Sequence, residues 1–139
     1  MVEDGIRFNL FVQSFSQLNE KYGDNTAQNI LDNCKIKPMI NQIPWYIGCR
    51  DEALKDYCNK HQILVESYSP LGTGKLLKNR KIAKMAEKYG VTPAQLCIRF
   101  ALQDVDITLP KTTHKERMIE NAKVDFEISD EDMEILKRI

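Results

Sequence analysis

The sequence predicts an α/β fold in which about four parallel strands alternate with helices. Apolar runs rich in β-forming residues recur along the chain, and each is followed by a stretch with helical spacing of its apolar residues. These runs lie at residues 6–12, 39–43, 63–70 and 105–110. Strands joined through helices pair in parallel, and four such units make half of an eight-stranded barrel. The predicted architecture is therefore a partial TIM barrel, or half-barrel.

Composition and charge are those of an ordinary globular protein. The 139 residues suffice for one domain spanning 1–139, and 42% of them are hydrophobic. Twenty basic and twenty acidic side chains balance, so no basic excess points to a nucleic-acid partner. The chain has no run of about 18 apolar residues and no signal-type N-terminus. We therefore expect no membrane partner and a cytoplasmic location.

Cysteine and histidine usage argues against disulfides and metals. The four cysteines form no CxxC pair, which fits a reducing compartment. Neither His61 nor His114 has a metal-ligating partner at a useful spacing. We therefore expect free thiols and no metal site.

The first predicted elements alternate between strand and helix. Residues 6–12 are the first strand, and Asp24 or Asn25 can cap a helix in the stretch that follows. The strand at 39–43 leads to a helix at 51–60, whose buried stripe has the spacing i, i+3, i+4. This stripe consists of Leu54, Tyr57 and Cys58.

The third predicted strand, at 63–70, starts with apolar residues that do not alternate cleanly with polar ones. Parallel barrel strands are covered on both faces, so we expect it to be the most buried strand. A helix follows at 80–89. Thr92 and Gln95 then form a predicted capping box for a helix with an apolar stripe broad enough for near-complete burial.

Two elements complete the predicted alternation. VDITLP, at 105–110, is the last strand. Ser129 and the acidic residues after it start a short terminal helix, because a hydroxyl cap and negative charge both favour a helix N-terminus. Its Met133 and Leu136 are expected to dock on the barrel wall.

The segment LPKTTHKERMIEN, at 109–121, has the composition of an anion site. It predicts a helix that ends near Lys123 and carries the polar residues in its first turns. A helix N-terminus offers free N–H groups and a partial positive charge, and Lys111 and Arg117 add two full charges. Threonine hydroxyls beside them add hydrogen-bond donors for the oxygens of a phosphate monoester. The alternative is a solvated amphipathic helix with a hydroxyl cap.

Three motifs follow one another in the second part of the chain. They are NQIPWY at 41–46, ILVESYSPLGTGKLL at 63–77 and PKTTHKERMIEN at 110–121. In this order they resemble the strand-six, strand-seven and strand-eight motifs of the aldo-keto reductases, (βα)8-barrel enzymes that reduce carbonyls with NADPH. The resemblance covers roughly residues 5–139 and implies the second half of such a barrel.

The resemblance implies an NADP(H) site and assigns its contacts residue by residue. Gln42 looks like the family glutamine that bonds the nicotinamide amide, and Tyr68 like the tyrosine that stacks on the nicotinamide ring. The residues similar to pyrophosphate contacts are Ser69, Leu71 and Thr73. Those similar to the 2′-phosphate clamp that favours NADPH over NADH are Lys111, Thr112 and Arg117. Those similar to the adenine-edge contacts are Glu120 and Asn121.

The chain departs from the family pattern at about residues 13–35. Gln13 and Ser14 stand where the family has the Ser and Asn that hold the carboxamide, so the side-chain lengths are exchanged. Residues 19–34 are longer than the family equivalent, which is either a harmless loop extension or a change of function. Trp45 and Tyr46 lie near the family's substrate pocket or are plain packing residues.

The resemblance implies hydride transfer between NADPH and an aldehyde or ketone. In the family a tyrosine donates the proton, an aspartate and a lysine lower its pKa, and a histidine orients the carbonyl. All four come from the first half of the barrel, so we assign no catalytic residue here and expect no turnover by the lone chain. The alternatives are a non-catalytic NADP(H)-binding module and a structural or interaction remnant.

A half-barrel leaves strand edges unpaired and an apolar inner face uncovered, and such edges attract partners. We therefore expect either a homodimer or association with a complementary N-terminal half-barrel chain. NADPH is the expected small-molecule partner.

Overall fold

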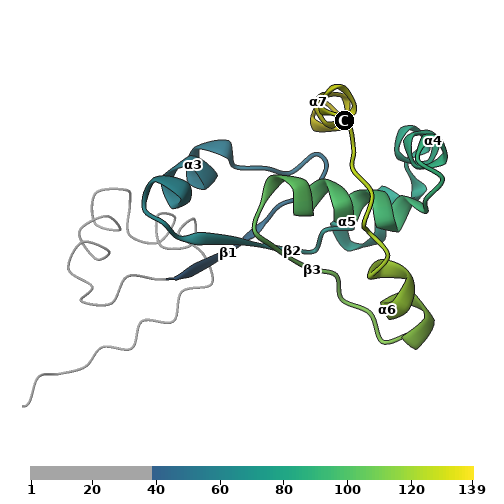
Figure 1. The fold of residues 1–139 in the computed structure, drawn as a ribbon, viewed down its shortest axis with the longest axis horizontal. Coiled ribbons are helices and arrows are strands. Elements are labelled where there is room, and N and C mark those ends of the chain that lie inside the picture. Colours follow the sequence, from purple (N-terminus) through teal and green to yellow (C-terminus); the bar gives the residue numbers. More distant parts are fainter. Residues whose placement is uncertain (1–38) are drawn as a thin grey trace, which may run out of the picture. The chain divides into compact units, whose positions relative to one another are not determined.

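A parallel sheet of three strands runs through the part of the chain that the computed structural model describes, residues 39–139 (Figure 1). The strands are β1 (Ile40–Pro44), β2 (Leu64–Tyr68) and β3 (Ile107–Leu109). They pair in the order β1-β2-β3. Each connection is helical, and the helices between strands are α3 (Glu52–Lys60), α4 (Arg80–Lys88) and α5 (Pro93–Asp104). The predicted α/β alternation and parallel pairing are confirmed for these residues.

The remaining elements are short. Two single-turn 3-10 helices, η1 (Gly72–Gly74) and η2 (Leu76–Lys78), lie between β2 and α4. Helix α6 (Lys115–Asn121) follows β3, and α7 (Asp130–Lys137) is the last element. The expected strand at 6–12, the contacts at Gln13 and Ser14, and the altered segment at 13–35 lie outside the described residues.

Three of the predicted helices start at residues whose side chains cap them. The Asp51 carboxylate accepts a hydrogen bond from Leu54 N at the start of α3. Thr92 and Gln95 form the reciprocal capping box of α5, and Ser129 caps α7. Because each cap satisfies a backbone N–H that has no partner within its helix, the local sequence alone determines where these helices begin.

The two faces of the sheet differ in their surroundings. Register partners on neighbouring strands share a face of the sheet, and one face packs under α3 and α5. On this covered face, Val65 and Ser67 are buried, and Asn41 Nδ2 lies 3.4 Å from Cys58 Sγ of α3. We call the opposite side the open face. It carries Ile40, Gln42, Pro44, Leu64, Glu66, Tyr68, Ile107 and Leu109.

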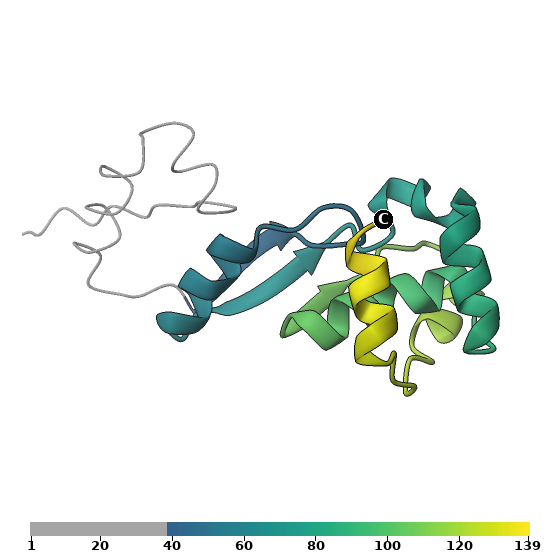
Figure 2. The ribbon, with the colours of Figure 1, turned by 90° about the horizontal axis from the view of Figure 1, so that it is seen from above.

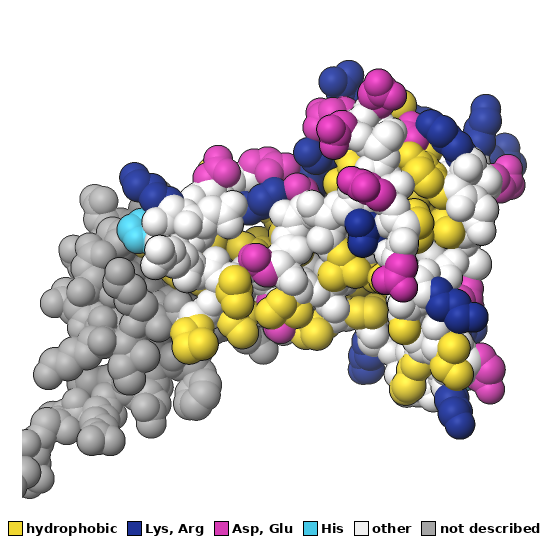
Figure 3. Space-filling view, viewed as in Figure 1, with side chains coloured by type: hydrophobic (Ala, Val, Ile, Leu, Met, Phe, Trp, Pro, Cys, Tyr) yellow, Lys and Arg dark blue, Asp and Glu magenta, His cyan; other side chains and the backbone are white. Residues whose placement is uncertain are grey.

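The open face corrects the expectation that the third predicted strand is covered on both faces, as parallel barrel strands are. In β2, Leu64 and Tyr68 are 44% and 41% exposed, and Ile40 and Leu109 on the adjacent strands are 45% exposed. Hydrophobic side chains accordingly gather along the strands on the surface (Figure 3). The reason is geometric: helices of residues 39–139 cover one face, whereas a closed barrel buries the other against its remaining strands.

Strand β3 is shorter than predicted, beginning at Ile107 rather than at 105. The Asp106 carboxylate accepts a hydrogen bond from Val65 N at 2.8 Å. A side chain therefore takes the backbone donor of β2 just before the ladder to β3 begins at the Glu66–Ile107 pair. Because the Asp106 side chain occupies this donor, the backbone pairing of β3 with β2 begins only at Ile107.

The main core lies between helices beside the sheet. Helix α7 (yellow) crosses α5 (green) in Figure 2, and its Met133 and Leu136 pack in one cluster with Leu96 and Phe100 of α5. Ile82 of α4 completes the three-helix contact. The predicted docking of the terminal helix and the near-complete burial of α5 are both confirmed. Trp45 is fully buried, and its Nε1 donates to Asp104 at 2.9 Å, which gives it a packing role.

Candidate functional site

The family-matched residues follow the carboxyl ends of the three strands. Tyr68 is the last residue of β2, and its register partners are Pro44 at the end of β1 and Leu109 at the end of β3. The turn after Tyr68 and the segment after Leu109 therefore leave the same edge of the sheet (Figure 1). In parallel α/β sheets this edge is where ligands bind. Gln42 lies two residues before this edge, on the open face.

Gln42 is held by a residue that the sequence analysis did not single out. Its Nε2 donates to Oε1 of Glu66 across 2.5 Å, and the two residues are direct register partners on the open face. Both side chains are half-buried. Because they are separated by 24 positions in the chain, only the alignment of β1 with β2 could have revealed the pair.

The turn after β2 combines left-handed backbone with tight hydrogen bonds. Ser69 and Thr73 have φ of 54° and 55°, a conformation that costs non-glycine residues about 1–3 kcal/mol each. Gly72 N donates to the Ser69 carbonyl at 2.8 Å, and Gly74 N donates to the Leu71 carbonyl at 2.9 Å. Strain of this kind, at residues matched to pyrophosphate contacts, is typical of a backbone shaped around a ligand.

The side chains of this turn have different surroundings. Thr73 is exposed, and its hydroxyl donates to the Gly72 carbonyl at 2.7 Å. Leu71 packs against the helical core, so only its backbone is available to a ligand. Tyr46 lies beside the turn, and the pKa of its phenol is raised mainly by a hydrogen bond with Cys49 and further by burial. The phenol therefore stays protonated around neutral pH.

The helix of the predicted anion site begins later than expected. Helix α6 starts at Lys115, so Lys111 and Thr112 precede it instead of lying in its first turn. The Thr112 hydroxyl accepts a hydrogen bond from His114 N at 3.2 Å and orders this connection. Glu120 and Asn121 lie in the last turn. The expected placement in the first turn is therefore wrong for Lys111 and Thr112, whereas Arg117 does lie in the first turn of this seven-residue helix.

Two cations of this segment, Lys111 and Arg117, are free to meet an anion. Lys111 and Arg117 are exposed, and within residues 39–139 no carboxylate forms an ion pair with either. Gln95 of α5 holds the end of this segment through hydrogen bonds to its backbone. Its Nε2 donates to the carbonyls of Glu120 and Lys123 at 3.0 and 3.1 Å. The sequence identified Gln95 as a capping residue but gave no signal for this second role.

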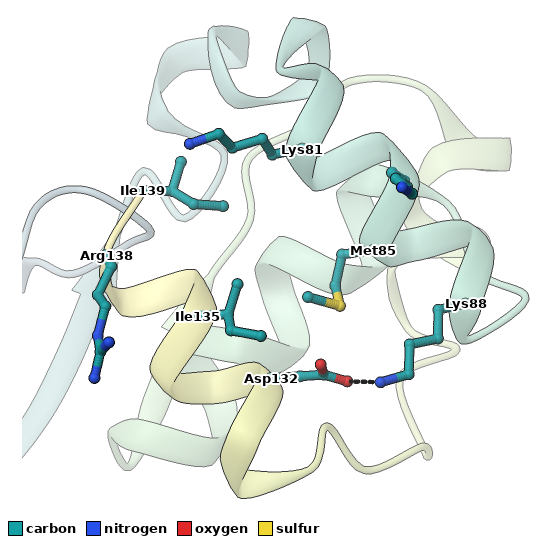
Figure 4. Close-up of a pocket in the computed structure, with 8 residues that line it drawn as sticks. Lys81, Met85, Lys88, Asp132, Ile135, Arg138 and Ile139 are labelled. Atoms are coloured by element: carbon teal, nitrogen blue, oxygen red, sulfur yellow. Dashed lines mark hydrogen bonds and ion pairs between the residues drawn. The ribbon is translucent and has the colours of Figure 1, made fainter.

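One cavity in the described part of the chain lies away from this site. It has a volume of about 680 Å³ and lies between α4 and α7 (Figure 4). Met85, Ile135 and Ile139 form its apolar lining, and the Lys88–Asp132 ion pair closes one side. None of the residues matched to cofactor contacts lines it.

The described part of the chain offers neither a metal cluster nor a membrane-spanning helix. Residues 39–139 contain no cluster of three or more His, Cys, Asp or Glu that could hold a metal ion. None of the helices described has the length and apolar character needed to cross a membrane.

Comparisons with known proteins agree with this geometry. The model of the aldo/keto reductase family matches residues 21–139. Glyoxal reductase of Bacillus subtilis (strain 168) is 40% identical over 108 residues, which are 77% of this chain and 39% of that protein. The chain therefore matches about two-fifths of the length of that curated relative.

Solved structures show the same relationship. The aldose reductase of Schistosoma japonicum superposes with a TM-score of 0.74 and 36% identity, covering 80% of this chain and 36% of that one. A mutant of Gox0644 in complex with NADPH superposes with a TM-score of 0.76 and 31% identity, covering 88% and 49%. By fold and by sequence, this chain belongs to the aldo/keto reductase family.

Proposed function

We propose that this chain is the cofactor-binding half of an NADP(H)-dependent aldo-keto reductase. When bound, NADPH supplies the hydride that reduces an aldehyde or ketone. The chain's own residues bind and orient the dinucleotide, and the proton donor comes from the other half of the barrel. The observation that carries this proposal is the convergence of three family-matched segments on one edge of a parallel sheet.

The residues present fit a dinucleotide with a 2′-phosphate. Lys111 and Arg117 are exposed cations without ion-pair partners in the described region, and such cations suit a phosphate monoester. Thr112 adds a hydroxyl between them in sequence. Glu120 and Asn121 follow at the end of α6 as the adenine contacts.

The other end of the dinucleotide meets the sheet and the turn after β2. Tyr68 is 41% exposed on the open face, which leaves its ring free to stack on a nicotinamide. Gln42 lies on the same face as an amide contact. Between them and the clamp, Ser69, Leu71 and Thr73 are proposed to meet the pyrophosphate through backbone N–H groups and hydroxyls, where left-handed residues expose the backbone.

The open face also indicates which protein partner the chain binds. It presents Ile40, Leu64, Tyr68 and Leu109 as large, exposed apolar side chains. Water contact with such a face is unfavourable, so we propose that a complementary N-terminal half-barrel covers it, or a second copy of this chain in its absence. A single substitution such as Leu64→Glu should abolish either association, and light scattering distinguishes monomer from dimer.

The function is tested by titrating the purified chain with NADPH and with NADH while following nucleotide fluorescence. Micromolar binding of NADPH, with weaker binding of NADH, is the expected result. Adding the first half of a related barrel should then restore carbonyl reduction. Absence of NADPH binding at millimolar concentration would contradict the proposal and favour a structural remnant.

A further inference from the structure

The Gln42–Glu66 pair has a chemical consequence beyond joining β1 to β2. A side-chain amide has two ends of similar shape, one that donates and one that accepts hydrogen bonds. An ionised carboxylate only accepts. The 2.5 Å contact of Gln42 with Glu66 is therefore possible only when the NH2 end of Gln42 faces Glu66.

The accepting end of Gln42 is left available. Among residues 39–139, no donor bonds to Gln42 Oε1, and the half-buried side chain lies on the open face. Tyr68 lies on the same face, two residues after Glu66 along β2. The acceptor thus belongs to the same surface as the ring proposed to stack on the nicotinamide.

We propose that Glu66 is a positioning residue that fixes the orientation of the Gln42 amide, so that Oε1 accepts from the NH2 group of the nicotinamide carboxamide. This inference rests on the proposed function and deepens it by assigning a residue outside the family-matched set. Without Glu66, the Gln42 amide can rotate by half a turn and place its own NH2 against the donor of the ligand. Two donors facing one another make no hydrogen bond.

A purely structural role for the pair predicts a different behaviour. If Glu66 only ties β1 to β2, its removal should lower stability and weaken every ligand of the site alike. If it orients Gln42, its removal should weaken only ligands that carry a nicotinamide, and only while Gln42 is present. The two cases are separated by comparing NADPH with adenosine 2′,5′-bisphosphate, which keeps the clamp contacts and lacks the nicotinamide.

The experiment is calorimetric titration of both nucleotides into the full chain and four variants. These are Glu66→Ala, Glu66→Gln, Gln42→Ala and the double variant Glu66→Ala/Gln42→Ala. Glu66→Gln keeps the shape of the side chain but introduces a group that both donates and accepts, so it removes the orientation without removing the contact. Thermal unfolding of each variant reports folding.

We expect Glu66→Ala to weaken NADPH about fivefold and Glu66→Gln about threefold, which are the effects of one misdirected hydrogen bond. Neither should change the affinity for adenosine 2′,5′-bisphosphate by more than about 1.5-fold. In the Gln42→Ala background, Glu66→Ala should have no further effect on NADPH, because residues that act through one another are not additive.

Three outcomes overturn the inference. They are an equal loss for both nucleotides, an undiminished effect of Glu66→Ala when Gln42 is already absent, and unchanged NADPH binding in Glu66→Ala. Any of these leaves the proposed function standing if the unmodified chain binds both nucleotides. If the unmodified chain binds neither, the proposed function and this inference fail together.

Discussion

The Asp132 carboxylate of α7 accepts a hydrogen bond from the Lys88 ammonium of α4 across 2.6 Å (Figure 4). The Tyr89 hydroxyl also donates to Asp132, and Ser129 N donates to the Tyr89 oxygen at 3.0 Å. Asp132 is only 4% exposed, so it is a buried acceptor. Its two side-chain donors are Lys88, the last residue of α4, and Tyr89, the C-cap of that helix. This network joins two helices that are more than 40 residues apart in the chain.

Replacing the buried carboxylate should destabilise the helical layer. For Asp132→Ala we expect a loss of about 2 kcal/mol in the free energy of unfolding, because hydrogen bonds to a charged group are lost and their donors remain. Urea unfolding followed by the fluorescence of Trp45 measures the change, since the chain contains one tryptophan and it is fully buried. As a control, Glu134→Ala breaks the exposed pair with Lys137 and should cost less than about 1 kcal/mol.

The same network predicts a pH dependence with a defined sign. The hydrogen bonds from Lys88 and then Tyr89 hold the pKa of Asp132 below its ordinary value. The stabilisation is therefore complete above the pKa of the unfolded state, about 3.9, and is lost as pH falls through the lowered folded value. Unfolding midpoints between pH 7 and pH 2 should converge for the wild-type chain and Asp132→Ala. A constant difference down to pH 2 would contradict this assignment.

Local chemistry explains which elements the sequence predicts well. The caps at Asp51, Thr92 and Ser129 satisfy backbone donors within three residues, so they depend on no distant contact. The apolar stripe of α5 likewise predicts from the local sequence alone that this helix is buried. These elements and the parallel alternation were predictable because their causes are close together in sequence.

Long-range contacts explain the errors and omissions. The delayed start of β3 depends on Asp106 reaching Val65, 41 positions away. The pairing of Gln42 with Glu66 depends on strand register, and the exposure of Leu64 depends on what covers the open face. None of these quantities has a local sequence signal. The cofactor contacts themselves came from the family resemblance rather than from periodicity or composition.

Two glycines of the turn after β2 offer a matched pair of substitutions. Both have positive φ, 53° for Gly72 and 85° for Gly74, so alanine is strained at either. A Cβ at Gly72 would also lie 3.0 Å from Leu76 Cγ, whereas one at Gly74 meets nothing within 4 Å. We expect Gly74→Ala to cost about 1–2 kcal/mol and Gly72→Ala about 2–4 kcal/mol, by urea unfolding. Equal losses would show that backbone strain alone determines the effect.

Burial should protect two of the cysteines from alkylation. Desolvation raises the pKa of Cys97 to about 12, and burial also raises the pKa of the Cys58 thiol. Because the thiolate is the reactive form, iodoacetamide at pH 8 should label half-buried Cys49 well before either of them in the folded protein. Peptide mass spectrometry reads the order, and labelling in urea is the control. Rapid labelling of Cys97 without urea would mean that α5 opens readily.

Charge reversal in the clamp should separate NADPH from NADH. Lys111→Glu and Arg117→Glu are each expected to weaken NADPH by about 10- to 100-fold, since each removes a charge-assisted contact to the 2′-phosphate. NADH lacks this phosphate, so its affinity should change much less. Lys60→Glu is the matched control, because it changes the net charge equally at the end of α3, before the amino end of β2. An equal loss of NADH affinity would show that these cations act only through the overall electrostatic potential of the protein and not through contact with the 2′-phosphate.

The anchoring of α6 by Gln95 can be isolated with one conservative change. Gln95→Glu keeps an acceptor for Thr92 N and so preserves the capping box. It removes the donor that bonds the carbonyls of Glu120 and Lys123 and places a negative charge beside them. We expect a loss of about 2–3 kcal/mol. Amide hydrogen exchange should accelerate in residues 115–123, and NADPH affinity should fall with the disordering of Glu120 and Asn121.

The matched control lies on the same helix. Gln103 binds the backbone of Ile128 in a similar way, with Nε2 donating to its carbonyl at 3.0 Å and Oε1 accepting from its N–H at 2.7 Å. Gln103→Glu likewise removes a donor to a backbone carbonyl, although Arg99 Nε, which donates to Oε1 at 3.0 Å, should offset part of the loss. Hydrogen exchange in α6 and NADPH affinity should stay unchanged. As pH falls, the carboxyl introduced at position 95 becomes protonated and can donate again, so exchange in α6 should slow toward the wild-type rate. Fast exchange that persists at low pH would mean that packing, rather than this donor, holds α6 in place.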